Sequence, residues 1–309
     1  MDRISDDSAI NESPDQESTH DTPQASAPLT DRISDALQNA VKAIIGSNRR
    51  PPRRFRSLLN GTWLGHPLHP AITDVPIGAW LLAVIFDIIW LISPTSNAWA
   101  ARGAEAAVLI GILAAVAAAV TGLTDWSDTY GSERTVGLYH AGLNTLALVL
   151  YIVSFVLRLT IPTGESLAAA ILGFIAIIAV LVAAYLGGDM VFDKATGVNH
   201  TVWPEGSHEF TPALPVAEMP ENSLKRVEVA GVPVVLLKLG SKYAAIAATC
   251  THAGGPLDEG ELQGDVVQCP WHGSRFRMTD GKALTGPATF SQPRYEVQVR
   301  DGIIYLRLA

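Results

Sequence analysis

The sequence predicts a multidomain protein, in which an all-α bundle of four transmembrane helices is followed by an all-β domain with a metal centre. Three observations carry this prediction. Four long apolar runs lie between residues 71 and 187, and short strand-like patterns follow from residue 224 to the C-terminus. The chain has two cysteines, Cys250 and Cys269, and each is followed within three residues by a histidine inside the strand-rich part.

The overall composition fits a membrane protein. Of the 309 residues, 48% are hydrophobic and only 17% are charged, whereas about a quarter of an ordinary soluble domain is charged. The net charge of −8 argues against a nucleic-acid-binding surface, so no nucleic-acid partner is expected. Two cysteines in a chain of this length exclude a disulfide scaffold and point to metal or redox chemistry.

Residues 1–60 are predicted to form a disordered tail with a short amphipathic helix and a basic cluster. Residues 1–30 are rich in Asp, Glu, Ser and Pro, and they have too little apolar surface to offset the entropy of ordering. No apolar core follows a basic start, so no cleavable secretory signal is expected. Apolar residues at helical spacing predict the amphipathic helix over residues 31–46.

Five arginines form the basic cluster: Arg49, Arg50, Arg53, Arg54 and Arg56. Such a cluster next to a membrane span is typically attracted to anionic lipid headgroups, so membrane lipids are expected partners. The alternative is a twin-arginine export signal, because Arg53, Arg54 and Phe55 are followed by two leucines.

Residues 61–203 are predicted to be the membrane domain. The four apolar stretches cover about 71–92, 103–124, 136–160 and 166–187. Each would be roughly 33 Å long as a helix, enough to cross a hydrocarbon core of about 30 Å. An even number of spans puts both termini on one side, and the excess of Lys and Arg before the first span puts that side in the cytoplasm. We therefore expect a multi-pass protein of the inner or plasma membrane with a cytoplasmic β domain.

The polar, proline-containing segment 204–218 is predicted to be a linker, and residues 219–309 the β domain. Strand patterns there are KRVEVA, PVVLLKL, KYAAIAAT, DVVQ, YEVQVR and GIIYLRL, with turns between them. Several short strands at close spacing predict a compact antiparallel domain of about 90 residues.

The decisive motif has two halves, Cys250-Thr251-His252 and Cys269-Pro270-Trp271-His272. Each half puts one Cys and one His on a tight loop bounded by Gly and Pro, so two thiolates and two imidazoles can converge. A structural zinc site is one alternative, although zinc fingers favour paired Cys followed by paired His. A pair of buried core histidines with two buried thiols is another. The order Cys-His then Cys-His favours a two-iron cluster with two thiolates on one iron and two imidazoles on the other.

These residues closely resemble the Rieske iron–sulfur family. The resemblance covers about residues 219–309 and includes CTHAGGPL at 250–257, CPWHGSRF at 269–276 and the closing YEVQVRDGIIYL. It implies a [2Fe–2S] cluster in which Cys250 and Cys269 bind one iron, and His252 and His272 bind the second.

Departures from the quinol-oxidising branch of that family are informative. Gly255 and Trp271 occupy the places of two cysteines that form a disulfide in that branch. The site is therefore similar to Rieske ferredoxins and oxygenase Rieske domains. Ser274 stands where a hydroxyl can donate to a cluster sulfur, and Phe276 stands where the high-potential branch has Tyr. With fewer hydrogen bonds to sulfur, the potential is expected in the lower part of the Rieske range of about −150 to +300 mV.

The expected role is transfer of single electrons to or from a separate redox partner, such as a reductase, an oxygenase or a respiratory component. A Rieske oxygenase also needs a non-haem iron domain, and the sequence shows no pattern for one after the last strand. An electron-transfer component without its own substrate-oxidising domain is therefore predicted. The alternative is a membrane sensor in which the cluster reports redox state or oxygen.

The membrane part resembles a bacterial four-helix family known as domain of unknown function 2231. The resemblance is carried by GHPLHPAITDVPIGAW at 65–80, GLYHAGLN at 137–144 and LGGDMVF at 186–192, and it implies no activity. Four histidines are expected at the cytoplasmic end of the helices: His66, His69, His140 and His200. An ionisable group inside a span usually faces the bundle interior and is functional. A second site is therefore predicted, holding haem b, another metal or a quinone, with purely structural histidines as the alternative.

Overall fold

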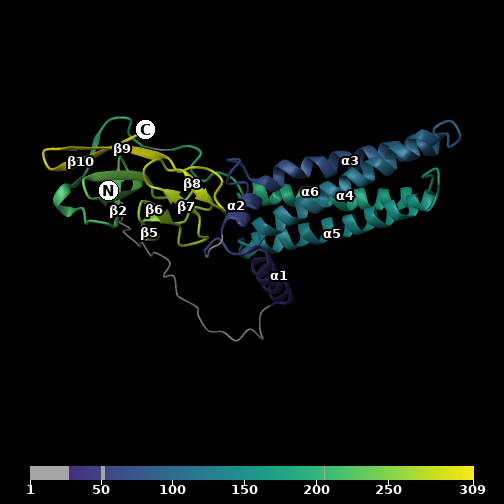
Figure 1. The fold of residues 1–309 in the computed structure, drawn as a ribbon, viewed down its shortest axis with the longest axis horizontal. Helices are drawn as coiled ribbons and strands as arrows, with labels where there is room; N and C mark the ends of the chain where they lie inside the picture. Colours follow the sequence, from purple (N-terminus) through teal and green to yellow (C-terminus); the bar gives the residue numbers. More distant parts are fainter. Residues whose placement is uncertain (1–27, 50–52, 205) are drawn as a thin grey trace, which may run out of the picture.

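The computed structural model describes residues 28–49, 53–204 and 206–309, and it places a long helical domain end to end with a β domain (Figure 1). The sequence predictions for residues 1–27 and for Arg50 lie outside these ranges. Six α-helices make up the described helical part: α1 Leu29–Ile45, α2 Arg54–Asn60, α3 Leu68–Ile92, α4 Ala98–Trp126, α5 Gly131–Leu159 and α6 Leu167–Phe192.

Helices α3 to α6 are the four predicted spans, and each is long and apolar enough to cross a membrane. Every one of them extends past an end of its apolar run. Helix α5, for example, begins at Gly131, five residues before the predicted start. Polar residues at a span's end interrupt the apolar pattern but not the hydrogen-bonded helix, so the helices are longer than the hydropathy alone indicates.

The four spans form two hairpins, with α3 packed closely on α4 and α5 packed closely on α6. Small residues allow this close approach. A Cβ atom on Gly111 of α4 would lie 2.2 Å from Nε1 of Trp80, so the indole of α3 rests directly on the glycine. Trp80 in turn stacks on Tyr151 of α5, with ring centroids 4.2 Å apart, and this stack joins the two hairpins.

A buried ion pair joins the hairpins again, nearer the end of the bundle that is remote from the β domain. Arg158 of α5 donates from Nη2 to Oδ2 of Asp87 on α3 at 2.6 Å, and both side chains are only 1% exposed. Breaking such a pair by removing one partner leaves an uncompensated charge in apolar surroundings, which is far more costly than the net value of the pair.

The β domain contains two antiparallel sheets. The larger has the strand order β1-β10-β9-β4-β3-β2 and the smaller the order β5-β6-β7-β8. Their bounds are β1 Thr211–Pro215, β2 Leu224–Val229, β3 Val232–Leu239, β4 Lys242–Ala247, β5 Glu261–Gln263, β6 Val266–Gln268, β7 Arg275–Arg277, β8 Ala283–Thr285, β9 Arg294–Arg300 and β10 Ile303–Leu308. The predicted all-β class is confirmed.

Strand β1 shows that the β domain begins earlier than predicted. Residues 211–215 were predicted as part of a linker, but they pair antiparallel with β10, from Thr211 opposite Leu306 to Pro215 opposite Ile303. Two prolines are tolerated because β1 is at the edge of its sheet, where a missing N–H costs no ladder bond. Leu214 fills the core beneath the sheet, so this strand belongs to the β domain.

Three further strands, β5, β7 and β8, were missed in the sequence. Each is only three residues long, and β7 reads Arg-Phe-Arg with one buried side chain. So short a strand shows no periodicity. These strands nevertheless bound a second apolar core, which contains Cys250 and Cys269 together with Phe276. The small sheet is therefore the platform on which the metal-binding loops stand.

The buried ion pair gives the first prediction. Arg158→Leu leaves the Asp87 carboxylate unpaired and should destabilise the detergent-solubilised chain by about 3–5 kcal/mol, seen as a lower midpoint of thermal unfolding. The double variant Asp87→Leu/Arg158→Leu should recover most of that loss. The control Arg102→Leu removes an exposed pair with Glu105 and should cost about 1 kcal/mol or less. Equal loss in the single and the double variant would contradict this account.

Candidate metal centre

The two Cys-His motifs form two loops with the same hydrogen bonds. In the first loop, the N–H of Gly254 donates to the carbonyl of Cys250 at 2.9 Å, and the N–H of Cys250 donates to the carbonyl of Gly255 at 2.8 Å. In the second loop, Gly273 donates to the carbonyl of Cys269 at 3.1 Å, and Cys269 donates to that of Ser274 at 2.8 Å. The two halves of the motif are therefore repeats in conformation as well as in residue type.

Glycine is required in both loops. Gly254 and Gly273 each have φ of +78°, a left-handed conformation that other residues adopt only with strain. A third glycine has a different reason: a Cβ atom on Gly255 would lie 2.9 Å from Sγ of Cys269 and 3.1 Å from the ring of Trp271. The first loop thus approaches the second so closely that a side chain at Gly255 has no room.

The two cysteines are the buried half of the site, with exposed fractions of 1% for Cys250 and 2% for Cys269. Neither is in a disulfide. The Cys250 thiol donates to the Cys269 sulfur, and this hydrogen bond lowers the pKa of Cys269 to about 7. The same contact, with burial, raises the pKa of Cys250. Two sulfurs so close together, one of them easily deprotonated, suit a shared metal that takes thiolate ligands.

The two histidines are the outer half of the site. Nδ1 of His252 lies 3.2 Å from Nδ1 of His272, and the two rings are nearly perpendicular at 80°. Burial lowers the pKa of both imidazoles, that of His252 to about 3 with further lowering by the neighbouring His272. Both rings are therefore neutral at physiological pH, which is the form that binds a metal.

The spacing within each pair fits ligands of one metal, while the two pairs remain separate. Two nitrogens bound at about 2.0–2.1 Å to one tetrahedral metal are about 3.3 Å apart, close to the separation of the two Nδ1 atoms. Within the described residues, no three His, Cys, Asp or Glu side chains are grouped around a single point. A mononuclear Cys₂His₂ zinc site would need four ligands around one ion. Two separated pairs are what a binuclear cluster with split ligation needs.

Ser274 and Phe276, which the sequence suggested as neighbours of a cluster, lie on or next to the second of the two loops. Both side chains are fully buried. The Ser274 oxygen accepts from the backbone N–H of Ala288 at 3.0 Å, so its own proton remains available for a cluster sulfur. Phe276 packs in the same apolar core as the cysteines and offers no donor.

A third loop, residues 286–290, holds the two metal-binding loops together and was missed in the sequence. The Thr251 hydroxyl donates to the carbonyl of Phe290 at 2.9 Å, and Ala288 donates to Ser274 as described. The same loop reaches the helical domain, because the Thr62 hydroxyl donates to the carbonyl of Ala288 at 3.2 Å. The Gly-Pro pair at its start marked a turn, but nothing in the sequence placed that turn at the metal centre.

The helical domain docks on the second metal-binding loop. The Arg49 guanidinium donates to the carbonyls of Pro270, at 2.8 Å, and Trp271. The ring of Tyr130, just before α5, lies 5.5 Å from that of His272. An open groove of about 440 Å³ remains between the two domains, lined by Arg49, Tyr130, Ala253, Pro270, Trp271 and His272. The imidazole edge of the site therefore faces both the membrane domain and solvent.

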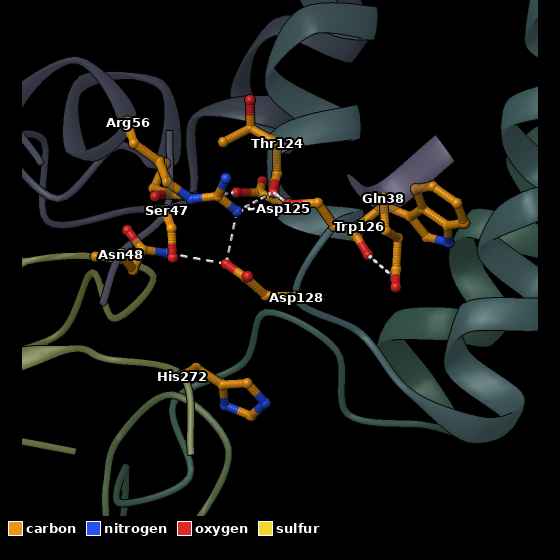
Figure 2. A network of polar contacts seen from close by, with 12 residues as sticks. Gln38, Ser47, Asn48, Arg56, Thr124, Asp125, Trp126, Asp128 and His272 are labelled. Atoms are coloured by element: carbon orange, nitrogen blue, oxygen red, sulfur yellow. Dashed lines mark hydrogen bonds and ion pairs between the residues drawn. The ribbon is translucent and has the colours of Figure 1, made fainter. Parts of the chain in front are cut away.

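Figure 2 shows the polar network behind this contact, in which Asp128 lies between His272 and Arg56. Asp128 accepts from Asn48 at 2.8 Å and from Arg56 at 2.7 Å. Arg56 is fully buried and also donates to the carbonyls of Gly46 and Thr124. The prediction that the whole cluster faces lipid headgroups is therefore wrong for Arg56, whose charge is used between protein elements; Arg54 is exposed.

The four histidines predicted at the end of the helices do not form one group. The structure brings His69 and His140 together, with ring centroids 6.3 Å apart. His66 is exposed, and its Nδ1 lies 2.8 Å from the carbonyl of the adjacent Pro67. His200 follows the last span, and its backbone N–H donates to the carbonyl of Thr251 in the first metal-binding loop. Of these four histidines, the structure therefore pairs His69 with His140 and leaves His66 and His200 apart from them.

Comparison with known protein families gives two matches along the chain. Residues 65–200 match the family described as "Predicted membrane protein (DUF2231)". Residues 209–296 match the "Rieske [2Fe-2S] domain". Together the two matches cover the helical spans and nearly all of the β domain.

The curated relatives match the β domain. "Ferredoxin CarAc" of Metapseudomonas resinovorans is 34% identical over 91 residues, which are 29% of this chain and 85% of that protein. The "3-phenylpropionate/cinnamic acid dioxygenase ferredoxin subunit" of Escherichia coli strain K12 is 37% identical over 97 residues, which are 31% of this chain and 91% of that protein. A solved complex of oxygenase and ferredoxin in carbazole 1,9a-dioxygenase contains a chain of 30% identity, matched with a TM-score of 0.31 over 33% of this chain and 94% of that chain.

The environment of Ser274 gives the second prediction. If its hydroxyl donates to a reduced, more negative cluster, Ser274→Ala should lower the midpoint potential by about 40–90 mV, the equivalent of about 1–2 kcal/mol for one electron. Phe276→Tyr adds a buried donor and should raise the potential. Redox titration followed by electron paramagnetic resonance measures both. Ser241→Ala, at an exposed turn, is the control, and a potential unchanged in both test variants would show that burial or net charge sets it.

Proposed function

We propose, because this chain belongs to the Rieske [2Fe–2S] family, that it is a membrane-anchored carrier that passes single electrons between its cluster and a separate redox protein. When bound, the cluster would supply a site that accepts and releases one electron. Cys250 and Cys269 would bind the inner iron, and His252 and His272 the outer iron.

The approach of the two Nδ1 atoms to 3.2 Å on matching loops is the observation that carries this proposal. It supports a preformed imidazole pair for one metal, beside a separate buried thiol pair. The burial is asymmetric: the thiols are enclosed, whereas the histidine side chains are partly exposed. An electron would therefore enter and leave most readily at the histidine edge.

The surface at this edge favours a protein partner. Trp271 is 48% exposed beside the ligand His272 and lines the groove between the domains. Exposed aromatic side chains of this kind are enriched in protein interfaces. The ferredoxins matched above are named as parts of dioxygenase systems, so we infer that the partner is a reductase, an oxygenase or a comparable respiratory component.

The charge distribution supports a cytoplasmic β domain. The end of the bundle next to the β domain carries Arg54, Arg134 and Lys194, besides the arginines of the domain contact. At the other end the cations of the described residues are Arg102 and Arg158, and Arg158 is buried in its ion pair with Asp87. By the positive-inside rule this distribution supports a cytoplasmic β domain, and the absence of a disulfide between the two cysteines agrees with a reducing compartment.

Haem b, the second cofactor suggested by the sequence, would be held by the helices and not by the Rieske domain. It is not needed for the electron-carrier function. The residues that would bind it are His69 on α3 and His140 on α5.

The third prediction tests the cluster. The full-length chain, purified without oxygen in detergent, should contain two irons and two labile sulfides and should accept one electron. Its reduced form should show the low mean g-value of mixed Cys/His ligation. Cys269→Ser or His272→Ala should abolish that signal, whereas His208→Ala, in a segment without metal ligands, should keep it. Stoichiometric zinc with no labile sulfide would contradict the proposal.

A carrier must also exchange its electron with a protein. The chain should be purified with native lipids, and redox proteins that co-purify should be mixed with the dithionite-reduced form in a stopped-flow spectrometer. A carrier predicts reoxidation of the cluster that is much faster than with buffer alone, and slower in Trp271→Ala at an unchanged potential. Reoxidation at the buffer rate with every co-purifying redox protein would favour the sensor and overturn the carrier.

The fourth prediction tests orientation with two matched cysteine variants. Ser241→Cys lies on an exposed turn of the β domain, and Ser96→Cys lies on the exposed loop between α3 and α4. A membrane-impermeant maleimide applied to intact cells should label Ser96→Cys and leave Ser241→Cys unlabelled until the cells are lysed. The reverse pattern would place the β domain outside and revive the twin-arginine interpretation.

A further inference from the structure

Helices α3 and α5 contain the same three-layer arrangement. His69 meets His140, Trp80 stacks on Tyr151, and Asp87 pairs with Arg158. In every pair the two partners are 71 residues apart in the sequence. The two helices therefore run in the same direction and in the same register, and the two hairpins are related as structural repeats. Two of the three layers have an evident structural role, as an aromatic stack and an ion pair.

The imidazole layer repeats its hydrogen bonds as well. Nδ1 of His69 lies 2.8 Å from the carbonyl of Ala118 on α4, and Nδ1 of His140 lies 2.8 Å from the carbonyl of Ala183 on α6. Because a carbonyl can only accept, Nδ1 of each ring carries a proton, and in the neutral ring Nε2 is then the unprotonated nitrogen that can bind a metal. Metal-binding histidines are commonly oriented by such a bond from the other ring nitrogen.

Glycines on the neighbouring helices α4 and α6 leave room for these rings. A Cβ atom on Gly122 would lie 2.7 Å from Cε1 of His69, and one on Gly187 would lie 3.1 Å from Cε1 of His140. The Ala118 carbonyl does not need the histidine, because it already accepts from the Thr121 hydroxyl at 3.0 Å. The bond to His69 therefore orients the imidazole and does not rescue an unsatisfied backbone group.

The separation of the ring centroids matches the value for two imidazoles bound on opposite sides of one metal. A metal–nitrogen distance of about 2.0 Å, plus about 1.1–1.2 Å from the nitrogen to the ring centre, places two opposed imidazoles about 6.3 Å apart, and a tetrahedral angle would reduce this to about 5 Å. The observed separation is 6.3 Å. Asn144 approaches Nε2 of His140 at 3.2 Å, and a metal at this site would replace that contact.

We propose that His69 and His140 are the two axial ligands of a haem held between the two hairpins. Two imidazoles are a sufficient protein ligand set for haem, because the porphyrin supplies the other four nitrogens. A bare metal ion would need further ligands, and no group of three His, Cys, Asp or Glu exists here within the described part of the chain. The hairpins also contact each other much less closely than the helices within each hairpin do, so the seam between them is the part of the bundle with the least direct helix packing.

A haem bound by His69 and His140 would lie near the Rieske site. Tyr130 precedes α5 and contacts the ring of His272, and His140 follows about 15 Å further along the same helix. The haem would thus lie at the cytoplasmic-side end of the bundle, if the orientation proposed above holds. Its existence does not rest on the electron-carrier function, because its ligands and its test are separate.

The fifth prediction is tested by spectroscopy on the full-length chain. The protein is expressed with added 5-aminolevulinic acid, extracted in mild detergent, and its spectrum is recorded before and after dithionite. One haem per chain is expected from the pyridine haemochrome assay, with the sharp reduced α-band of six-coordinate haem. His69→Ala and His140→Ala should each lose that band, and Gly122→Leu should lose it by displacing the His69 ring. His66→Ala, an exposed neighbour on the same segment, should retain it.

The Rieske resonance of the same samples reports whether each variant is folded and inserted. His140→Met supplies a second check, because a thioether keeps six coordination but changes the spectrum and raises the haem potential. A cluster-loaded wild type without haem would overturn the proposal, as would a haem that persists in both His69→Ala and His140→Ala. A bare metal bound at these histidines in place of haem would also overturn it. Failure of the Rieske signal with haem retained would instead count against the proposed function.

Discussion

The structure depends on one buried cation at the junction of its two domains. The Arg56 guanidinium, with no exposed surface, donates to the end of α1, to the end of α4 and to Asp128. A buried charge is tolerated only where its hydrogen bonds are made, so these segments must keep their relative positions. Asp128 in turn lies beside His272, as Figure 2 shows. The geometry around the metal centre is thus set partly by residues of the membrane domain.

These contacts hold the β domain in one orientation on the helical domain. A β domain joined only by a flexible segment would sample many orientations. Here Arg49 contacts the second metal-binding loop, Thr62 contacts the third loop, and His200 contacts the first. All three loops around the metal centre therefore touch the helical domain or the chain that leaves it. The helices therefore act as a platform that holds the β domain at one end of the bundle, and Figure 1 shows this end-to-end placement.

Both histidine pairs are built by the same physical rule, although one stands on loops and the other on helices. Each pair comes from repeated local structure: two loops with identical hydrogen bonds for His252 and His272, and two hairpins with identical carbonyl contacts for His69 and His140. Such repetition places two equivalent imidazole ligands on either side of a pseudo-symmetry axis. In each case, glycines supply the close approach that a side chain would prevent. A pair of donors facing each other is the natural product of such symmetry.

The sequence by itself determined the four spans, the β class and the four candidate ligands of the metal centre, because these depend on patterns carried by neighbouring residues. Apolar runs and paired Cys-His motifs are local. The sequence did not predict three other features, because each depends on a partner far along the chain. Strand β1 pairs with β10, the third loop bonds to Ser274, and Arg56 pairs with Asp128. Likewise, the sequence indicated four histidines near one membrane surface, and only the tertiary structure brought the side chains of His69 and His140 together. Local patterns report propensity and burial, whereas the choice of partner is made by tertiary contacts, which bring together residues that the chain itself holds far apart.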